Sequence, residues 1–150
     1  MDHTERSGYE PGANVVNLVA TGVMVPEAVA ASRLLEADGI HANVLALTSP
    51  RLAYAGWRGA LEACVRQTGG RPGFWLRRLV SDDEREGEVP LVSVLDGHSH
   101  ALAWLGSALG VPQVALGVDG FGQSGARDDL YRHYGIDPET IAAAARIMLR

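Results

Sequence analysis

The sequence predicts an open, three-layer α/β domain with a mostly parallel sheet. Four short apolar runs, each bounded by Gly, Pro, Asn or Asp, have the composition of buried strands. They alternate with segments of helical spacing, and because the runs are mainly apolar and do not alternate between apolar and polar residues, helices should cover both faces of the sheet. With 150 residues, of which 47% are hydrophobic and 21% charged, the chain is long enough to bury one core.

Each predicted element follows from its own local pattern. The strands are expected at residues 15–20, 42–48, 91–95 and 114–118, and the helices at 26–37, 52–66, 100–109, 127–134 and 138–149. Pro26 suits the first turn of the first helix, and Gly39 can end that helix in the left-handed conformation. Asp137 precedes Pro138 at the start of the last helix. These helix ends support the division of the chain independently of the apolar spacing.

Two segments lie outside this alternation. Residues 1–13 are polar and are expected to form an extended or disordered tail, so the domain itself covers residues 14–150. Residues 67–90 combine a glycine-rich stretch with the acidic run 82–88, and we predict a variable surface excursion there. Arginines beside aromatic residues in this segment could suggest nucleic acid, but the adjacent acidic run cancels their field.

Composition excludes several classes of function. All 13 basic residues are arginines, which removes Schiff-base catalysis and a phosphate-loop lysine. The formal net charge of -5 argues against nucleic acid or an anionic membrane as a partner. A single cysteine, Cys64, cannot form an internal disulfide, and no stretch has the pattern of a signal peptide or a membrane span. We therefore expect a cytoplasmic protein.

Residues 120–125 read Gly-Phe-Gly-Gln-Ser-Gly and match the dinucleotide-binding fingerprint letter for letter. A Rossmann unit also needs a second parallel strand that carries an acidic residue about 20 positions further on. This chain instead ends in the alanine-rich helix of residues 138–149. We interpret the segment as a tight glycine loop whose backbone amides face the carboxyl end of the sheet.

Residues 96–100, Asp-Gly-His-Ser-His, place a carboxylate and two imidazoles directly after a predicted strand. Such a loop could supply three ligands to a metal ion, but a strand-end Asp or Ser more often caps the next helix, so we expect no metal. A Ser-His-Asp hydrolase could be assembled from Ser99 or Ser124 with His133. Neither serine lies in the nucleophile-elbow sequence G-x-S-x-G, and we expect no catalytic residue in this chain.

A ligand, if one binds, is expected at the carboxyl edge of the sheet. Loops that run from a strand to a helix bring unpaired backbone amides and positive helix ends to one crevice, which suits a small anion. Asp96 and Asp119 oppose the same charge, so the expected affinity for phosphate is millimolar. The predicted anion-binding residues are Gly97, His98, Ser99, His100, Gly120, Gly122, Ser124 and Arg127.

Four segments carry a resemblance to a known family. They are VNLVATG at 16–22 with PEA at 26–28, LTSPRL at 47–52, SHALAWLGS at 99–107 and LGVDGFGQSG at 116–125. The last is the most specific, and LY at 130–131 and YGID at 134–137 follow it. Together they resemble the C-terminal domain of the transketolase superfamily, most closely that of the homodimeric-type pyruvate dehydrogenase E1 component. The resemblance covers residues 14–147.

The resemblance implies a five-stranded, mostly parallel sheet in the third domain of a thiamine-diphosphate enzyme, an oxidoreductase that decarboxylates a 2-oxo acid. In that family a first domain with a Gly-Asp-Gly to Asn-Asn motif holds the diphosphate and its Mg²⁺, and a second holds the aminopyrimidine and the activating glutamate. This chain matches neither, so no cofactor is expected in it. Its expected partners are the upstream thiamine-binding domains, in cis or in trans, within a homodimer.

Two functions remain open. The first is the C-terminal domain of such an E1 enzyme, which supports the dimer and the architecture without chemistry of its own. The second is a free-standing binding or regulatory module for a small anionic ligand on the same fold. We favour the first. A reading frame that continues upstream into thiamine-binding domains would separate the two.

Overall fold

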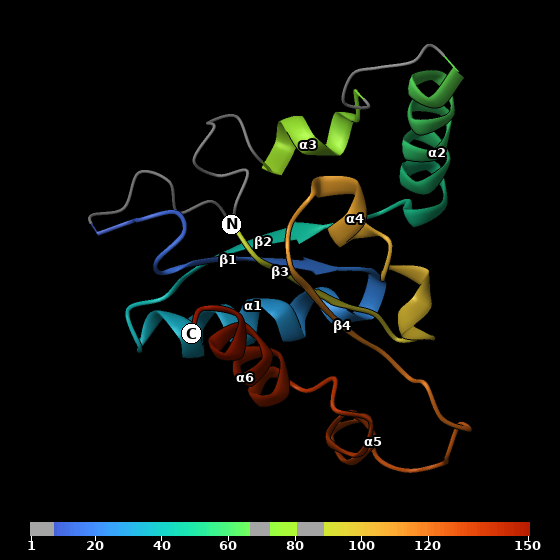
Figure 1. Ribbon diagram of the computed structural model, residues 1–150. Coiled ribbons are helices and arrows are strands. Elements are labelled where there is room, and N and C mark those ends of the chain that lie inside the picture. Colours follow the sequence, from blue (N-terminus) through green and yellow to red (C-terminus); the bar gives the residue numbers. More distant parts are fainter. Residues whose placement is uncertain (1–7, 67–72, 81–88) are drawn as a thin grey trace.

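The computed structural model describes residues 8–66, 73–80 and 89–150 (Figure 1). Its strands are β1 (Val15–Ala20), β2 (His41–Ala46), β3 (Leu91–Val94) and β4 (Gln113–Leu116). Its helices are α1 (Val25–Glu36), α2 (Pro50–Arg66), α3 (Trp75–Val80), α4 (Leu105–Leu109), α5 (Arg127–Tyr134) and α6 (Pro138–Met148). Short 3-10 helices cover Gly22–Met24 and Ser99–Ala101.

The four described strands form one parallel sheet in the order β2-β1-β3-β4. β1 is central and pairs with β2 on one side and β3 on the other; Asn17, for example, lies opposite both Asn43 and Leu91. The predicted α/β fold with a parallel sheet is confirmed. The resemblance implies a fifth strand, whereas the described residues form four, in keeping with the four apolar runs of strand type in the sequence.

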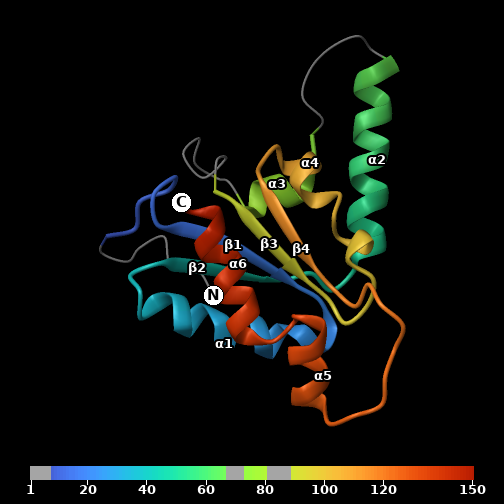
Figure 2. The same cartoon turned by 60° about the horizontal axis from the view of Figure 1, so that its bottom comes forward.

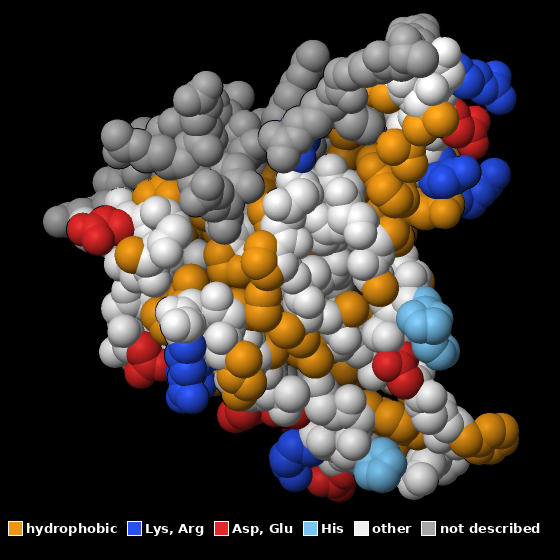
Figure 3. Space-filling view, viewed as in Figure 1, with side chains coloured by type: hydrophobic (Ala, Val, Ile, Leu, Met, Phe, Trp, Pro, Cys, Tyr) orange, Lys and Arg blue, Asp and Glu red, His pale blue; other side chains and the backbone are white. Residues whose placement is uncertain are grey.

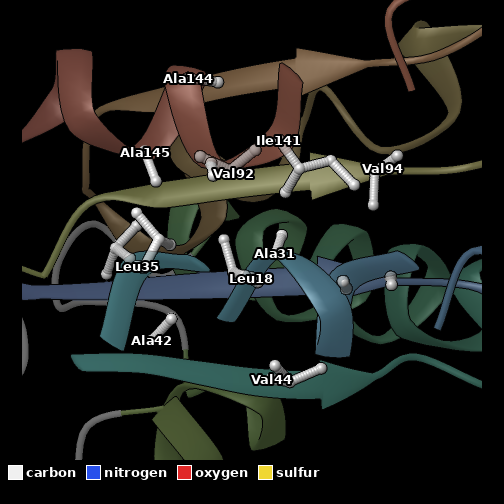
Figure 4. Close-up of a cluster of buried hydrophobic side chains, with 14 of the residues drawn as sticks. Leu18, Ala31, Leu35, Ala42, Val44, Val92, Val94, Ile141, Ala144 and Ala145 are labelled. Carbon is white, nitrogen blue, oxygen red and sulfur yellow. The ribbon is translucent and has the colours of Figure 1, made fainter. Parts of the chain in front are cut away.

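Helices cover both faces of this sheet (Figure 2). α1, α5 and α6 lie on one face, and α2, α3 and α4 lie on the other. On the first face, Leu18 and Val92 of the sheet belong to one core with Leu35 of α1 and Ile141 of α6 (Figure 4). Every residue of β1 is buried, because both of its faces are covered. This explains why five of its six residues are apolar and why apolar and polar residues do not alternate along it.

α3 differs from the surface excursion predicted for residues 67–90. Phe74 and Leu76 are buried in the core that this helix shares with α2 and α4. The glycine-rich and acidic stretches on either side obscured this short apolar pattern. Residues 67–72 and 81–88 lie outside the described residues.

The described part of the predicted tail packs against the domain. The Asn14 side chain accepts a hydrogen bond from the backbone N–H of Glu10 at 2.9 Å. Asn43 of β2 donates to the hydroxyl of Tyr9 at 3.0 Å. Residues 8–13 therefore form a turn against the edge strand, while residues 1–7 lie outside the described part of the chain.

The helix predicted for residues 100–109 is interrupted. A 3-10 turn covers Ser99–Ala101, and α4 begins only at Leu105. The side-chain amide of Gln113 explains the break, because its Oε1 accepts from the Gly106 N–H at 2.6 Å and its Nε2 donates to the Leu102 carbonyl at 2.9 Å. In a continuous α-helix these two backbone groups would bond to each other. Gln113 thus replaces one helical hydrogen bond with two of its own.

The other predicted elements are present, with ends shifted by one or two residues at most. Pro26 lies in the first turn of α1, and Asp137 is the N-cap of α6, as predicted. Among the helices described, none is both long enough and apolar enough to cross a membrane.

Candidate functional site

The loops after β3 and β4 meet at the carboxyl edge of the sheet, as the sequence predicts. The backbone N–H of Val118 donates to the carbonyl of Gly97 at 2.8 Å and joins the two loops. Gly117 makes this approach possible, because a Cβ there would lie 2.5 Å from the Gly97 oxygen and 2.6 Å from the Ser99 nitrogen. No side chain fits at this position.

Asp119 is the centre of the polar network at this edge. Its Oδ1 accepts from the backbone N–H of Ser99 at 2.8 Å, and its Oδ2 accepts from the Ser99 hydroxyl, also at 2.8 Å. These two hydrogen bonds hold the pKa of Asp119 below its usual value, and the bond from the backbone N–H has the larger effect. Both donors that the sequence analysis assigned to an external anion are therefore engaged by an internal carboxylate.

His98 and His100 stand beside this carboxylate and are exposed. Nδ1 of His98 lies 3.3 Å from Asp119 Oδ1 and also 3.3 Å from the backbone nitrogen of His100. The two contacts need opposite states of Nδ1, because a protonated nitrogen donates to the carboxylate and an unprotonated one accepts from the amide. The two imidazole rings lie 4.6 Å apart.

The network does not have the geometry of a hydrolase or a metal site. Asp119 lies between Ser99 and His98, whereas a Ser-His-Asp nucleophile needs the imidazole between the other two groups. His133 lies on α5, where its ring contacts Tyr134 at 4.8 Å. In the described ranges, no group of three or more His, Cys, Asp and Glu residues is placed to hold a metal ion.

The remaining predicted residues belong to the glycine loop and the start of α5. Gly120, Gly122 and Ser124 are exposed in the loop. The Tyr134 hydroxyl donates to the Phe121 carbonyl at 2.7 Å and ties the loop to α5.

Arg127 follows this loop at the first position of α5. Its Nε donates to Asp128 Oδ1 at 3.0 Å, and this hydrogen bond, with the charge of Asp128, raises the pKa of the guanidinium. The positive charge proposed for an anion is therefore shared with a neighbouring carboxylate. Anion binding at this edge stays a prediction.

Sequence reasoning missed two structural roles here. Asp119 was considered only for its charge, although it receives both donors of Ser99. Gly117 was not singled out, although its missing side chain lets the loops meet. Both residues lie in the segment 116–125, which carries the most specific part of the family resemblance. That resemblance was the signal in the sequence that could have drawn attention to them.

Comparison with known proteins identifies the family. The transketolase-like TK C-terminal domain family matches residues 6–137 of the chain. The chain belongs to this family. This transketolase-like domain is 34% identical over 148 residues to the chromosomal transketolase of Cupriavidus necator and 28% identical over 158 residues to transketolase 2 of Xanthobacter flavus. The alignments cover 96% and 97% of this chain but only 18% and 20% of those relatives.

Solved structures agree with the transketolase-like fold. A transketolase mutant from Pichia stipitis aligns with a TM-score of 0.60 at 24% identity, over 94% of this chain and 17% of the other. A split-gene transketolase, described as an inactive β4 tetramer, aligns with a TM-score of 0.58 at 23% identity, over 94% and 42%. The predicted superfamily is thus confirmed for the domain. Particular closeness to the pyruvate dehydrogenase E1 component is not shown, because these relatives are named transketolases.

Proposed function

We propose that this chain is the C-terminal domain of a thiamine-diphosphate enzyme and that it supports assembly of that enzyme without carrying out chemistry. The network around Asp119 carries this proposal. Its Ser99 donors are used within the domain, so the edge presents few groups that could act on a substrate. The curated relatives, of which this chain spans about a fifth, support a domain role. This chain has a single cysteine, Cys64, which supports our proposal that the domain works in a reducing compartment such as the cytoplasm.

The described residues do not fit the diphosphate and Mg²⁺ of thiamine diphosphate. Magnesium needs carboxylate or carbonyl ligands in octahedral geometry, and diphosphate needs positive charge or free amides. The carboxylate at the loop junction is already bonded to Ser99, and Arg127 is paired with Asp128. We propose that the cofactor and its metal are held by other domains of the parent enzyme, in cis or in trans.

Two reactions are candidates for the parent enzyme. The named relatives favour the transketolase reaction. The segment 116–125 resembles the pyruvate dehydrogenase E1 component and favours decarboxylation of a 2-oxo acid. Assays of the parent enzyme with xylulose 5-phosphate, which a Pichia stipitis transketolase binds, and with pyruvate distinguish them.

Calorimetry tests whether the cofactor is bound by other domains and not by this chain. We expect the purified chain to show no saturable binding of thiamine diphosphate in the presence of Mg²⁺, because Asp119 and Arg127 are engaged within the domain and the single carboxylate of Asp96 does not suffice to hold the metal. The matched measurement uses the same chain joined to its upstream domains, which should bind. Saturable micromolar binding by the chain alone would overturn the proposal.

The second part of the proposal concerns assembly through α2 and α3. α2 stands away from the body of the domain, and only Ala53 of this helix is fully buried (Figures 1 and 2). Trp57 stacks on Trp104 at 5.4 Å and fixes the base of the helix. Hydrophobic side chains gather along α2 (Figure 3), where Leu52 and Val65 are 66% and 72% exposed. These two residues lie about 140° apart around the helix, so α2 exposes apolar side chains on more than one side. Exposed apolar side chains that gather in this way are typical of an interface.

We expect the isolated chain to self-associate through α2. Leu52→Asp combined with Val65→Asp should weaken association at least about tenfold, since charges are depleted from interface cores. Ile147→Asp on α6, where the isoleucine is 65% exposed, is the control and should change little. Sedimentation velocity over a concentration series measures the effect. A chain that stays monomeric at high concentration would contradict this expectation.

A further inference from the structure

A separate pocket lies between the glycine loop and α5. It has a volume of about 390 Å³ and reaches from Asp96, just beyond β3, to Tyr131 and Tyr134 on α5. The hydrogen bond from the Tyr134 hydroxyl to the Phe121 carbonyl holds the loop against the helix. The volume lies within the range of small-molecule sites.

The floor of this pocket is apolar. Val118, Leu130 and Ile136 line it, and Ile136 is fully buried. The two tyrosines add aromatic surface. A lining of this composition favours a ligand with an apolar or aromatic body, because such a body leaves water when it binds.

Asp96 is the acidic group of the pocket. In the part of the chain that the structure describes, no hydrogen bond or ion pair joins its carboxylate to another residue, and the residue is exposed. Asp96 and Tyr131 line the same pocket, and burial together with the charge of Asp96 raises the pKa of the Tyr131 phenol. Asp96 can therefore accept hydrogen bonds from a ligand.

The charged side chains that line the pocket are the carboxylate of Asp96 and the guanidinium of Arg127. The guanidinium is paired with Asp128 at 3.0 Å, and the charge of Glu27 also raises its pKa. Among the described residues that line the pocket, Asp96 therefore carries the one charge without a partner. An unpaired carboxylate attracts a cation and repels an anion.

We propose that this pocket binds a small organic cation, namely an ammonium group attached to an apolar or aromatic body. The ammonium pairs with Asp96, and the ring of Tyr134 favours a cation over an anion. The Tyr131 ring already lies under the Arg127 guanidinium at 5.8 Å, so it contributes apolar surface to the ligand's body. Anion binding that involves Gly122 and Arg127, as the sequence predicts, is the competing outcome of the test below. This site is independent of the assembly role, so the failure of either proposal leaves the other standing.

Three probes test the proposal: phenethylamine, phenylethyl alcohol and phenylacetate. They share a phenyl ring on a short chain, and their end groups are positive, neutral and negative. In amide NMR titrations, phenethylamine should shift the signals of Asp96, Val118, Gly122, Gln123 and Gly125. The neutral alcohol should shift the same signals more weakly, and phenylacetate should not. Binding of phenylacetate as tight as that of phenethylamine would overturn the proposal, as would shifts scattered over the surface.

Two matched variants locate the charge. Asp96→Asn should weaken phenethylamine binding about fivefold, the effect of one exposed ion pair. Asp129→Asn removes an acid that pairs with Arg132 at 3.3 Å on the same helix, and it should leave binding unchanged. Unfolding in urea verifies that both variants are folded. Equal affinity of Asp96→Asn and the unchanged chain would exclude a cation site at Asp96.

Discussion

Replacing Gly117 by alanine is expected to destabilise the domain by about 3 kcal/mol. The added Cβ would lie 2.5 Å from the carbonyl oxygen of Gly97 and 2.6 Å from the nitrogen of Ser99. Both are backbone atoms, so no side-chain rotation relieves the clash. The loop after β3 must move, and the 2.8 Å bonds from Val118 to Gly97 and from Ser99 to Asp119 weaken with it.

Gly122→Ala is the matched control for this variant. Gly122 lies further along the same loop after β4, and apart from its chain neighbours no heavy atom is within 4 Å of a Cβ built there, so its change in unfolding free energy should stay below about 0.5 kcal/mol. Denaturation in urea compares the two variants directly. Equal stability would show that the two loops do not approach as closely as the structure has them.

The fold was predictable where local pattern and burial agree. The residues of β1 are apolar with one exception, and all are buried on a central strand, so composition alone identifies it. Asp137 was predictable as an N-cap because capping involves only near neighbours. Its carboxylate accepts from the backbone N–H and the hydroxyl of Thr140 at 3.1 and 2.7 Å. Burial opposes ionisation of Asp137, but these bonds outweigh it and lower its pKa.

For the candidate site, the sequence predicts the location but not the hydrogen bonds within it. Parallel strands bring their carboxyl ends to one edge, so the meeting of the loops after β3 and β4 follows from the fold. Which groups bond to each other does not follow. Ser99 and Asp119 are 20 residues apart, and only the register of β3 against β4 places the hydroxyl on the carboxylate.

The interrupted helix before α4 is a second case in which the sequence pattern does not predict a contact between distant residues, here one made by a single side chain. The spacing of residues 100–109 predicts one helix, and the residue that breaks it lies on a strand beyond its end. The Gln113 side chain reaches the backbone between Leu102 and Gly106 because Gly106 has no side chain. A Cβ at Gly106 would lie 2.8 Å from the Gln113 Cβ. Local periodicity contains no information about such an insertion.

Gln113→Leu is expected to cost about 3 kcal/mol of stability. The amide bonds to the Gly106 N–H, to the Leu102 carbonyl and, at 2.7 Å, to the hydroxyl of Ser93, which is fully buried. Leucine preserves the bulk of the side chain but leaves all three groups without this partner. Gln123→Leu, in the exposed glycine loop, is the control and should change the unfolding free energy by less than about 0.5 kcal/mol.

Two further measurements separate the hydrogen bonds of Gln113 from simple packing. If the Ser93 bond matters, Ser93→Ala should cost about 1 kcal/mol less in the Gln113→Leu background than in the unchanged chain. The amide of Gly106 should also exchange faster with solvent once its acceptor is removed. A Gln113→Leu protein of unchanged stability, with slow exchange at Gly106 and more helical circular dichroism, would mean that Gly106 has bonded back to Leu102. The continuous helix that the sequence predicts would then be as stable as the interrupted one, and Gln113 would not be what breaks it.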